Sequence, residues 1–184
     1  MSRKRKVTAA QGGMNGQIFM VGTGGQGILL LSRALARIAV QEGKPVIASE
    51  THGMAMRGDT VTANLKIGDY AGPLIPAGSA DLLIGLDDAE ASAFLYMLGK
   101  GGISIVNTGE EGPFDHAIDA TGMALKAGMP GSVNMIMLGF VTRILGIPLE
   151  EARRVIEELS PSRTLEDNLE AMTAGYRYTL QRSS

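Results

Sequence analysis

A short glycine-rich stretch near the N-terminus carries the clearest chemical signal in the sequence. Gly22–Gly27 reads G-T-G-G-Q-G, follows an apolar run and precedes a helix-forming stretch, so it matches the pattern G-x-G-x-x-G in the appropriate context. Small residues let backbone N–H groups approach an anion, and a helix N-terminus adds unpaired donors and a favourable dipole. We therefore expect a phosphate or another anion of a cofactor to bind here. The predicted cofactor-binding residues of the loop are Gly22, Gly24, Gly25, Gln26 and Gly27. The alternative is that these glycines serve only a tight turn and close packing of helix on strand.

A second polar stretch, Glu50–Asp59, supplies the candidate catalytic side chains His52 and Arg57. His52 could act as a general base, or it could be a neutral, packed histidine. Arg57 could hold a carboxylate or phosphate in bidentate fashion or dock on an acidic partner surface, since its guanidinium is a planar fork of donors. The simpler alternative is a surface ion pair with a neighbouring carboxylate. A lone histidine without cysteines is a poor metal site, so we expect no metal here.

Two further positions follow apolar runs and should lie at the same end of the predicted sheet. Asn107 ends one such run, and we expect it to contribute to cofactor binding. Asp87 and Asp88 end another and resemble a catalytic carboxylate pair. Asp88, however, stands where a helix N-cap belongs, and we prefer that interpretation.

Composition narrows the class of protein. The chain has 184 residues and no cysteine, so it can hold neither disulfides nor a cysteine-ligated iron–sulfur cluster. Four of its 17 basic residues fall within Arg3–Lys6, and the remaining 13 face 19 acidic residues. Such an acidic body is a poor nucleic-acid binder. No run approaches the roughly 20 apolar residues of a membrane span, and the N-terminus lacks a signal-peptide pattern. A cytoplasmic location is expected.

The hydrophobic pattern predicts an α/β fold. A strand around Ile18–Val21, the glycine loop, a helix over Ile28–Glu42 and a strand over Pro45–Ser49 make one βαβ unit. Thr60–Ile67 alternates and predicts a half-exposed strand, whereas Glu50–Asp59 predicts a loop. The remaining predicted elements are strands over Asp81–Leu86 and Ile103–Asn107, a helix over Asp88–Leu98, and helices around Val133–Leu145, Leu149–Leu159 and Leu165–Tyr176. We expect a Rossmann-like, doubly wound, largely parallel sheet with a helical C-terminal third. Residues 1–16 are expected to be a disordered basic tail, and 17–184 a single domain.

Four segments, taken in order, resemble one known family. They are Gly22–Gly27, Ser49–Gly58 (S-E-T-H-G-M-A-M-R-G), Asp81–Asp87 (D-L-L-I-G-L-D) and Asn134–Gly139 (N-M-I-M-L-G). This set resembles the gamma-type domain of the 2-oxoacid:ferredoxin oxidoreductases, also called the pyruvate/ketoisovalerate oxidoreductase catalytic domain. The second segment is most similar to the beta subunits of indolepyruvate oxidoreductases, and the ending Asn168–Tyr176 is similar too. The chain departs from the family at Asp59, where a second glycine is usual, and in the short stretch 107–120.

The resemblance implies a function that this chain does not perform alone. Members of the family convert a 2-oxoacid to an acyl-coenzyme A with thiamine diphosphate and pass electrons through iron–sulfur clusters to ferredoxin. The thiamine and cluster motifs belong to other domains or subunits, so a large partner subunit is implied. An aryl pyruvate such as indolepyruvate is the implied substrate. Two alternatives stay open: a stand-alone dinucleotide-binding oxidoreductase, in which Glu50 would bind the ribose, and a non-catalytic interaction module.

Overall fold

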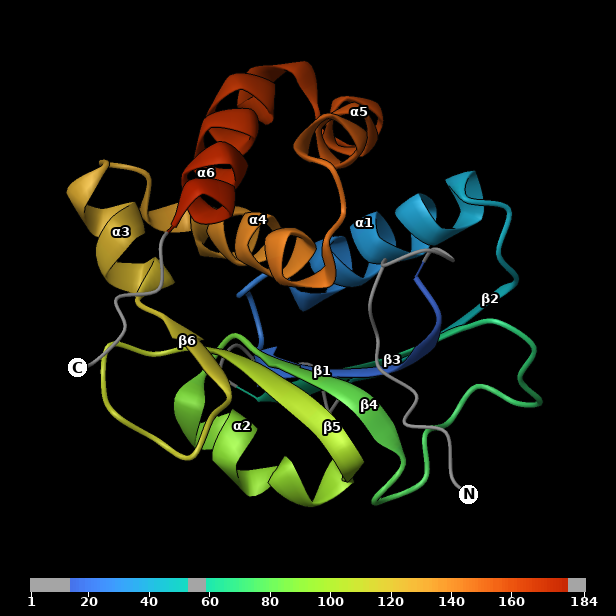
Figure 1. Ribbon diagram of the computed structural model, residues 1–184. Coiled ribbons are helices and arrows are strands. Elements are labelled where there is room, and N and C mark those ends of the chain that lie inside the picture. Colours follow the sequence, from blue (N-terminus) through green and yellow to red (C-terminus); the bar gives the residue numbers. More distant parts are fainter. Residues whose placement is uncertain (1–13, 53–58, 179–184) are drawn as a thin grey trace.

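The computed structural model describes residues 14–52 and 59–178, which form a six-stranded sheet with helices on both faces (Figure 1). The strands are β1 (Gly16–Thr23), β2 (Val46–His52), β3 (Thr60–Ile67), β4 (Ala80–Gly85), β5 (Leu98–Asn107) and β6 (His116–Ile118). The α-helices are α1 (Ile28–Gln41), α2 (Asp88–Ala93), α3 (Ala120–Lys126), α4 (Val133–Leu145), α5 (Leu149–Leu159) and α6 (Leu165–Arg177). Three short 3₁₀ turns are η1 (Leu95–Met97), η2 (Pro130–Ser132) and η3 (Ser162–Thr164).

The strand order is β2-β3-β1-β4-β5-β6. β3 pairs antiparallel with both β1 and β2, whereas the β1–β4, β4–β5 and β5–β6 pairs are parallel. Five of the six strands therefore run in the same direction. The predicted Rossmann-like, largely parallel α/β class is confirmed, with one antiparallel strand inserted between the two strands of the first βαβ unit.

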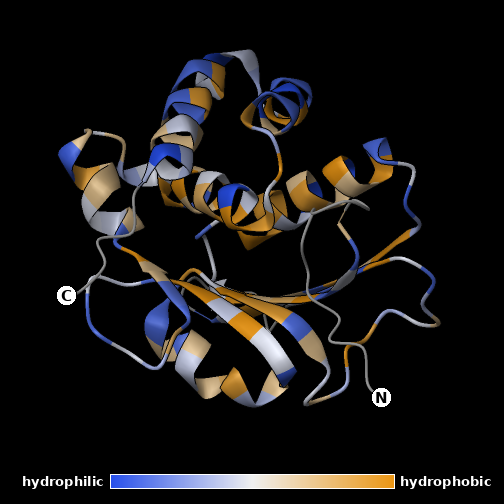
Figure 2. Cartoon of the chain, in the orientation of Figure 1, coloured by the Kyte–Doolittle hydropathy of each residue, from blue (hydrophilic) through white to orange (hydrophobic). Residues whose placement is uncertain are grey.

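The helices cover the two faces of the sheet unequally (Figure 1). α1 and α4 lie against one face, and α5 and α6 form a further layer outside them; α2 and η1 cover part of the other face. Figure 2 shows hydrophobic colour concentrated in the strands and in the sheet-facing sides of α1 and α4. α5 and α6 are hydrophilic on their outer faces. The apolar surfaces of the sheet, of α1 and α4, and of the inner sides of α5 and α6 therefore face one another and are buried together.

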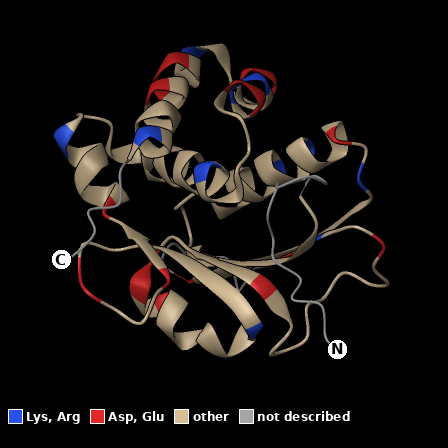
Figure 3. Ribbon diagram, in the orientation of Figure 1, with Lys and Arg blue, Asp and Glu red and all other residues tan. Residues whose placement is uncertain are grey.

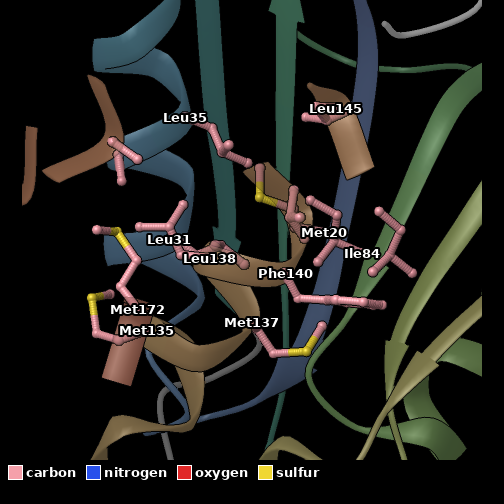
Figure 4. Close-up of a cluster of buried hydrophobic side chains, with 14 of the residues drawn as sticks. Met20, Leu31, Leu35, Ile84, Met135, Met137, Leu138, Phe140, Leu145 and Met172 are labelled. Carbon is pink, nitrogen blue, oxygen red and sulfur yellow. The ribbon is translucent and has the colours of Figure 1, made fainter. Parts of the chain in front are cut away.

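α4 is the central helix of the main core. It is apolar on nearly all sides, because the sheet, α1 and α6 surround it. Methionine fills much of this core, as the sequence suggests, and Figure 4 shows several of the side chains together. The fully or almost fully buried members labelled there are Met20, Leu31, Leu35, Ile84, Met135, Met137, Leu138, Phe140, Leu145 and Met172. Flexible, unbranched methionines suit a core with few aromatic residues. Within the described segments, no helix has the length and apolarity needed to cross a membrane.

The prediction that one face of β3 is exposed to solvent is wrong for the second half of the strand. Asn64 and Lys66 are only 4% exposed. The stretch after β3 covers them: the backbone N–H of Ile75 donates to Asn64 Oδ1 at 3.3 Å, and Lys66 Nζ lies 5.7 Å from the centre of the Tyr70 ring. The alternation of polar and apolar residues within β3 does not show that a later segment of the chain covers its polar side chains.

Several predicted boundaries also move. β2 continues to His52, so the polar stretch predicted as a loop from Glu50 begins as a strand. The predicted tail overlaps the fold, because Met14 is fully buried and Gly16 begins β1. The predicted helix over 88–98 is instead the short α2 followed by η1. α3 was not predicted; it begins at Ala120, soon after β6, so residues 108–119 between β5 and α3 hold only turns and that strand.

Candidate functional site

The glycine loop lies where the order of the strands reverses. The next two strands in the chain, β2 and β3, lie on one side of β1, and the later strands, beginning with β4, lie on its other side. The carboxyl ends of β1 and β4 meet there, and the N–H of Leu86, just past β4, donates to Val21 O at 2.9 Å. Open α/β sheets bind ligands in the crevice at such a point. The structure therefore places Gly22–Gly27 at the position that this rule favours.

The loop closes on itself through the side chain of Gln26. The N–H of Thr23 donates to Gln26 Oε1 at 2.7 Å, and the N–H of Gln26 donates to Thr23 O at 3.1 Å. The N–H of Gly24 donates to Asp59 O at 2.8 Å. These bonds use three of the loop's backbone donors. Among the residues that the structure describes, the donors left for an anion are those of Gly25, Gly27 and the first turn of α1.

Gly25 and Gly27 both have positive φ, of 97° and 84°, but for different structural reasons. A Cβ at Gly25 would meet no atom within 4 Å, whereas one at Gly27 would overlap the side chain of Asn134, with Cγ at 2.8 Å. Gly27 is the residue before α1, and Asn134 lies in the first turn of α4. The two helices thus begin side by side, and Gly27 allows their close approach. Asn134 was predicted only as part of a family-like segment, without a role.

A cavity of about 230 Å³ opens next to the loop. It is built from the ends of the strands β4 and β5, the turns that follow them, and the start of α3. Its lining residues are Gln26, Leu86, Asp87, Asp88, Asn107, Thr108, Gly109, Glu110, Asp119 and Thr121. Of the predicted site residues, the structure brings Gln26 and Asn107 together here. Thr108, which directly follows β5, adds a hydroxyl group, as expected of a residue at this strand end. Thr121 adds a second hydroxyl group that sequence reasoning missed, since its position depends on α3.

The charge of this cavity is negative. Its lining includes four carboxylates and no lysine or arginine, and Figure 3 shows acidic residues at the start of α2, in the loop before β6 and at the start of α3. Asp87 is the N-cap of α2, accepting from the N–H of Glu90 at 3.0 Å. The predicted cap, Asp88, instead accepts from Thr108 Oγ1 at 2.9 Å. These carboxylates disfavour a phosphate inside the cavity and favour hydroxyl or cationic groups.

Asn107 is held on every polar atom by the chain itself. Its Nδ2 donates to Leu86 O at 3.0 Å and to Thr121 Oγ1 at 2.9 Å, and its Oδ1 accepts from the N–H of Thr121 at 3.2 Å. The residue is 8% exposed. It therefore joins the end of β4, the end of β5 and the first turn of α3, and its cofactor-binding role stays a prediction.

The two candidate catalytic residues are described only in part. His52 ends β2 opposite Val61 of β3, and its side chain is not described; Arg57 lies outside the described residues. Asp59, two residues after Arg57, contacts Gly24 as given above, so the stretch between β2 and β3 ends at the glycine loop. Within the ranges 14–52 and 59–178, no group of three or more His, Asp or Glu side chains is arranged to hold a metal ion.

Glu50, the residue that a dinucleotide enzyme would need, is not next to the glycine loop. β3 separates β2 from β1. Neighbouring strands lie about 4.8 Å apart, so β2 is about 10 Å from β1 rather than adjacent to it. In the dinucleotide-binding fold the acidic residue ends the strand directly beside the first. The inserted antiparallel strand therefore argues against the dinucleotide alternative.

These features define a Rossmann-like α/β protein with a glycine loop and a polar, acidic crevice at its strand ends. Residues 17–178 match the family model described as pyruvate ferredoxin/flavodoxin oxidoreductase. The chain belongs to this family. The match spans nearly all of the described structure.

Curated relatives include small subunits named for different 2-oxoacids. The chain is 33% identical to an indolepyruvate oxidoreductase subunit IorB of Archaeoglobus fulgidus, over 89% of this chain and 94% of that protein. It is 31% identical to a pyruvate synthase subunit PorC of Thermotoga maritima, over 84% and 90%. Among solved structures, the pyruvate oxidoreductase subunit PORC of Thermotoga maritima superposes with a TM-score of 0.73 at 30% identity, covering 88% of this chain and 95% of that one. The homologues are thus subunits of 2-oxoacid:ferredoxin oxidoreductases.

Proposed function

We propose that this chain is the small, gamma-type subunit of a thiamine-dependent 2-oxoacid:ferredoxin oxidoreductase and is inactive on its own. The observation that carries the proposal is the match to the indolepyruvate oxidoreductase subunit IorB over almost the whole length of both chains. In this reaction a 2-oxoacid is decarboxylated and oxidised to its acyl-coenzyme A, and ferredoxin takes the electrons. A large subunit is the required partner, and the cytoplasmic location stays a prediction.

Indolepyruvate or another aryl pyruvate is the substrate that we propose. Four relatives named as indolepyruvate oxidoreductase subunits match at 28–33% identity, and those named for pyruvate or 2-oxoglutarate match over slightly less of this chain. The difference between 33% and 31% identity is small. A direct comparison of kcat/KM for different 2-oxoacids in the assembled enzyme tests this proposal.

The redox and thiamine cofactors do not fit the residues of this chain. A cluster requires thiolate ligands, and the sequence has no cysteine. Bound thiamine diphosphate would supply carbanion stabilisation, but its diphosphate would be repelled by the carboxylates of the crevice. We place both cofactors on the partner subunit. The crevice residues of this chain are left to position the partner or a part of coenzyme A rich in hydroxyl groups.

The test is reconstitution with a large, thiamine- and iron–sulfur-binding oxidoreductase subunit from the same organism. The two proteins should co-purify, and together they should reduce ferredoxin in the presence of indolepyruvate and coenzyme A, with lower kcat/KM for pyruvate and 2-oxoglutarate. The chain alone should show neither activity nor absorbance of a cluster after reconstitution with iron and sulfide. Saturable NAD(P) binding by the isolated chain would support the dinucleotide alternative. Failure to co-purify with any such subunit would support the interaction module.

A further inference from the structure

Two polar side chains at the start of α4 are almost fully buried without a hydrogen bond. Ser132 directly precedes the helix and Asn134 is its second residue, and each of them is only 8% exposed. Within residues 14–52 and 59–178, neither the Ser132 hydroxyl nor the Asn134 amide has a hydrogen-bond partner. A buried polar group without a partner costs about 1–3 kcal/mol, so two of them at one helix end need a physical explanation.

The Asn134 amide lies beside the glycine loop. A Cβ on Gly27 would overlap this amide, so the amide packs against the residue that directly precedes α1. The N-termini of the 14-residue α1 and the 13-residue α4 therefore adjoin at this point. Each helix N-terminus carries roughly half a positive charge, and two of them together favour an anion more than one does.

Unused backbone donors are available at the same place. In the part of the chain that the structure describes, the N–H groups of residues 27–30 have no acceptor, and the N–H of Leu31 is the first of α1 to bond, to Gly27 O at 3.2 Å. Free N–H groups at a helix start that follows a glycine loop are a common binding site for phosphate.

The two unpartnered side chains can be reached from outside. No side-chain nitrogen or oxygen of the described residues is both fully buried and without a partner. The polar ends of Ser132 and Asn134 therefore keep some contact with the surface, through which a ligand can approach. Neither residue lines the acidic cavity, so the carboxylates of that cavity do not line this place.

We propose that a phosphate group binds between the N-termini of α1 and α4. Its oxygens accept hydrogen bonds from the N–H groups of residues 27–30, from the Asn134 amide and from the Ser132 hydroxyl. A phosphate has three strong acceptor oxygens, which suits donors that come from two helices and two side chains. The phosphate belongs to a nucleotide or to another phosphate ester. The inference does not depend on the proposed function, because every residue of the site lies in this chain.

Titration of the purified full-length chain with inorganic phosphate, followed by calorimetry and by the melting temperature, tests the site. We expect saturable binding and a rise in the melting temperature. Asn134→Asp keeps the shape of the side chain but places a carboxylate against the phosphate, so it should weaken binding at least tenfold. Asn134→Ala and Ser132→Ala each remove one donor and should weaken binding about three- to tenfold. Thr164→Ala is the matched control, since Thr164 directly precedes α6 and its hydroxyl already donates to Pro161 O; binding should be unchanged.

The stability of the phosphate-free chain separates a role in binding from a role in the fold. Asn134→Ala removes an amide that has no partner, so the melting temperature without phosphate should fall by no more than about 3 °C. A larger fall would show that the amide serves the fold, and the proposal would be wrong.

ADP distinguishes the two sources of the phosphate. ADP that binds at least tenfold more tightly than inorganic phosphate would assign the site to a nucleotide, and equal binding would assign it to another phosphate ester; both results support the site. A native chain that binds neither compound would overturn the proposal. Binding that all three variants at Ser132 and Asn134 leave unchanged would also overturn it, because the anion would then lie elsewhere, for example on the basic cluster Arg3–Lys6.

Discussion

Gly139 of α4 and Gly175 of α6 are in contact with each other's helices at the point where the two helices cross. A Cβ on Gly139 would overlap Met172 O and lie 2.7 Å from the backbone N of Tyr176, and a Cβ on Gly175 would overlap Ile136 O. Backbone therefore packs directly on backbone at this crossing. Both glycines fall in the segments through which the sequence resembles its family, which gives those segments a physical role: they hold α6 against the central helix.

Gly139→Ala should destabilise the protein by about 3 kcal/mol, because the new methyl group meets fixed backbone rather than a movable side chain. The helix propensity gained by replacing glycine, about 1 kcal/mol, offsets only part of this cost. The measurement is the free energy of unfolding in urea. Gly131→Ala is the control, since a Cβ there would meet no atom within 4 Å. Its stability should change by less than about 0.5 kcal/mol, and equal effects at the two positions would refute the close crossing.

Gly27→Ala should cost more than Gly25→Ala, although both residues have positive φ. Positive φ alone costs roughly 1–2 kcal/mol for a residue with a side chain. Gly25 bears only that cost, whereas at Gly27 the methyl group also overlaps Asn134. The double variant Gly27→Ala/Asn134→Ala should recover part of the loss, with a coupling of about 1 kcal/mol in a double-mutant cycle. Additive effects would show that Asn134 yields freely and that the helices do not depend on Gly27 for their approach.

The sequence predicts the parts of this fold that depend on local pattern. β1, α1 and α4 are bounded by glycines and consist of long apolar runs, and they occur where predicted, with α4 at the same limits. The burial of Lys66 was not predictable in this way. A later segment, which includes Tyr70, covers this side chain, and the residues of β3 do not indicate that contact. The inserted position of β3 has the same cause: order in a sheet is decided by contacts between segments far apart in the chain.

The candidate site shows the same division. The glycine loop is identified from local residues and lies at the expected strand end. The acidic cavity requires the ends of β4 and β5 and the start of α3 to converge, and α3 itself escaped prediction. Asp87 and Asp88 show where a local argument stops. An aspartate N-cap was correctly expected for α2, but it was assigned to Asp88 instead of Asp87. The sequence alone does not decide between two adjacent aspartates that can both cap a helix.

Asn107→Ala should lower the free energy of unfolding by about 2–3 kcal/mol, because it removes three hydrogen bonds and leaves Leu86 O and the N–H of Thr121 without their partner. Thr121→Val removes only the hydroxyl that accepts from Asn107, so it should cost about 1 kcal/mol. Chemical denaturation of the isolated chain measures both. If Asn107 serves only to bind a cofactor, Asn107→Ala will leave this stability unchanged and lower only the activity of the complex.

Arg57→Lys should lower the activity or assembly of the reconstituted complex at least tenfold, about 1.4 kcal/mol, while the melting temperature of the isolated chain changes by no more than about 2 °C. Lysine keeps the charge of arginine but lacks the planar fork that binds a carboxylate or phosphate through two parallel hydrogen bonds. The stretch that carries Arg57 ends at Asp59, whose carbonyl oxygen accepts from Gly24 of the glycine loop, so a bidentate role at the crevice is consistent with the described part of the chain. An exposed ion pair with a nearby carboxylate would instead contribute only about 0–1 kcal/mol and tolerate lysine. Titration with the large subunit separates weaker assembly from a lower kcat at saturation, and unchanged values of both would remove Arg57 from the site.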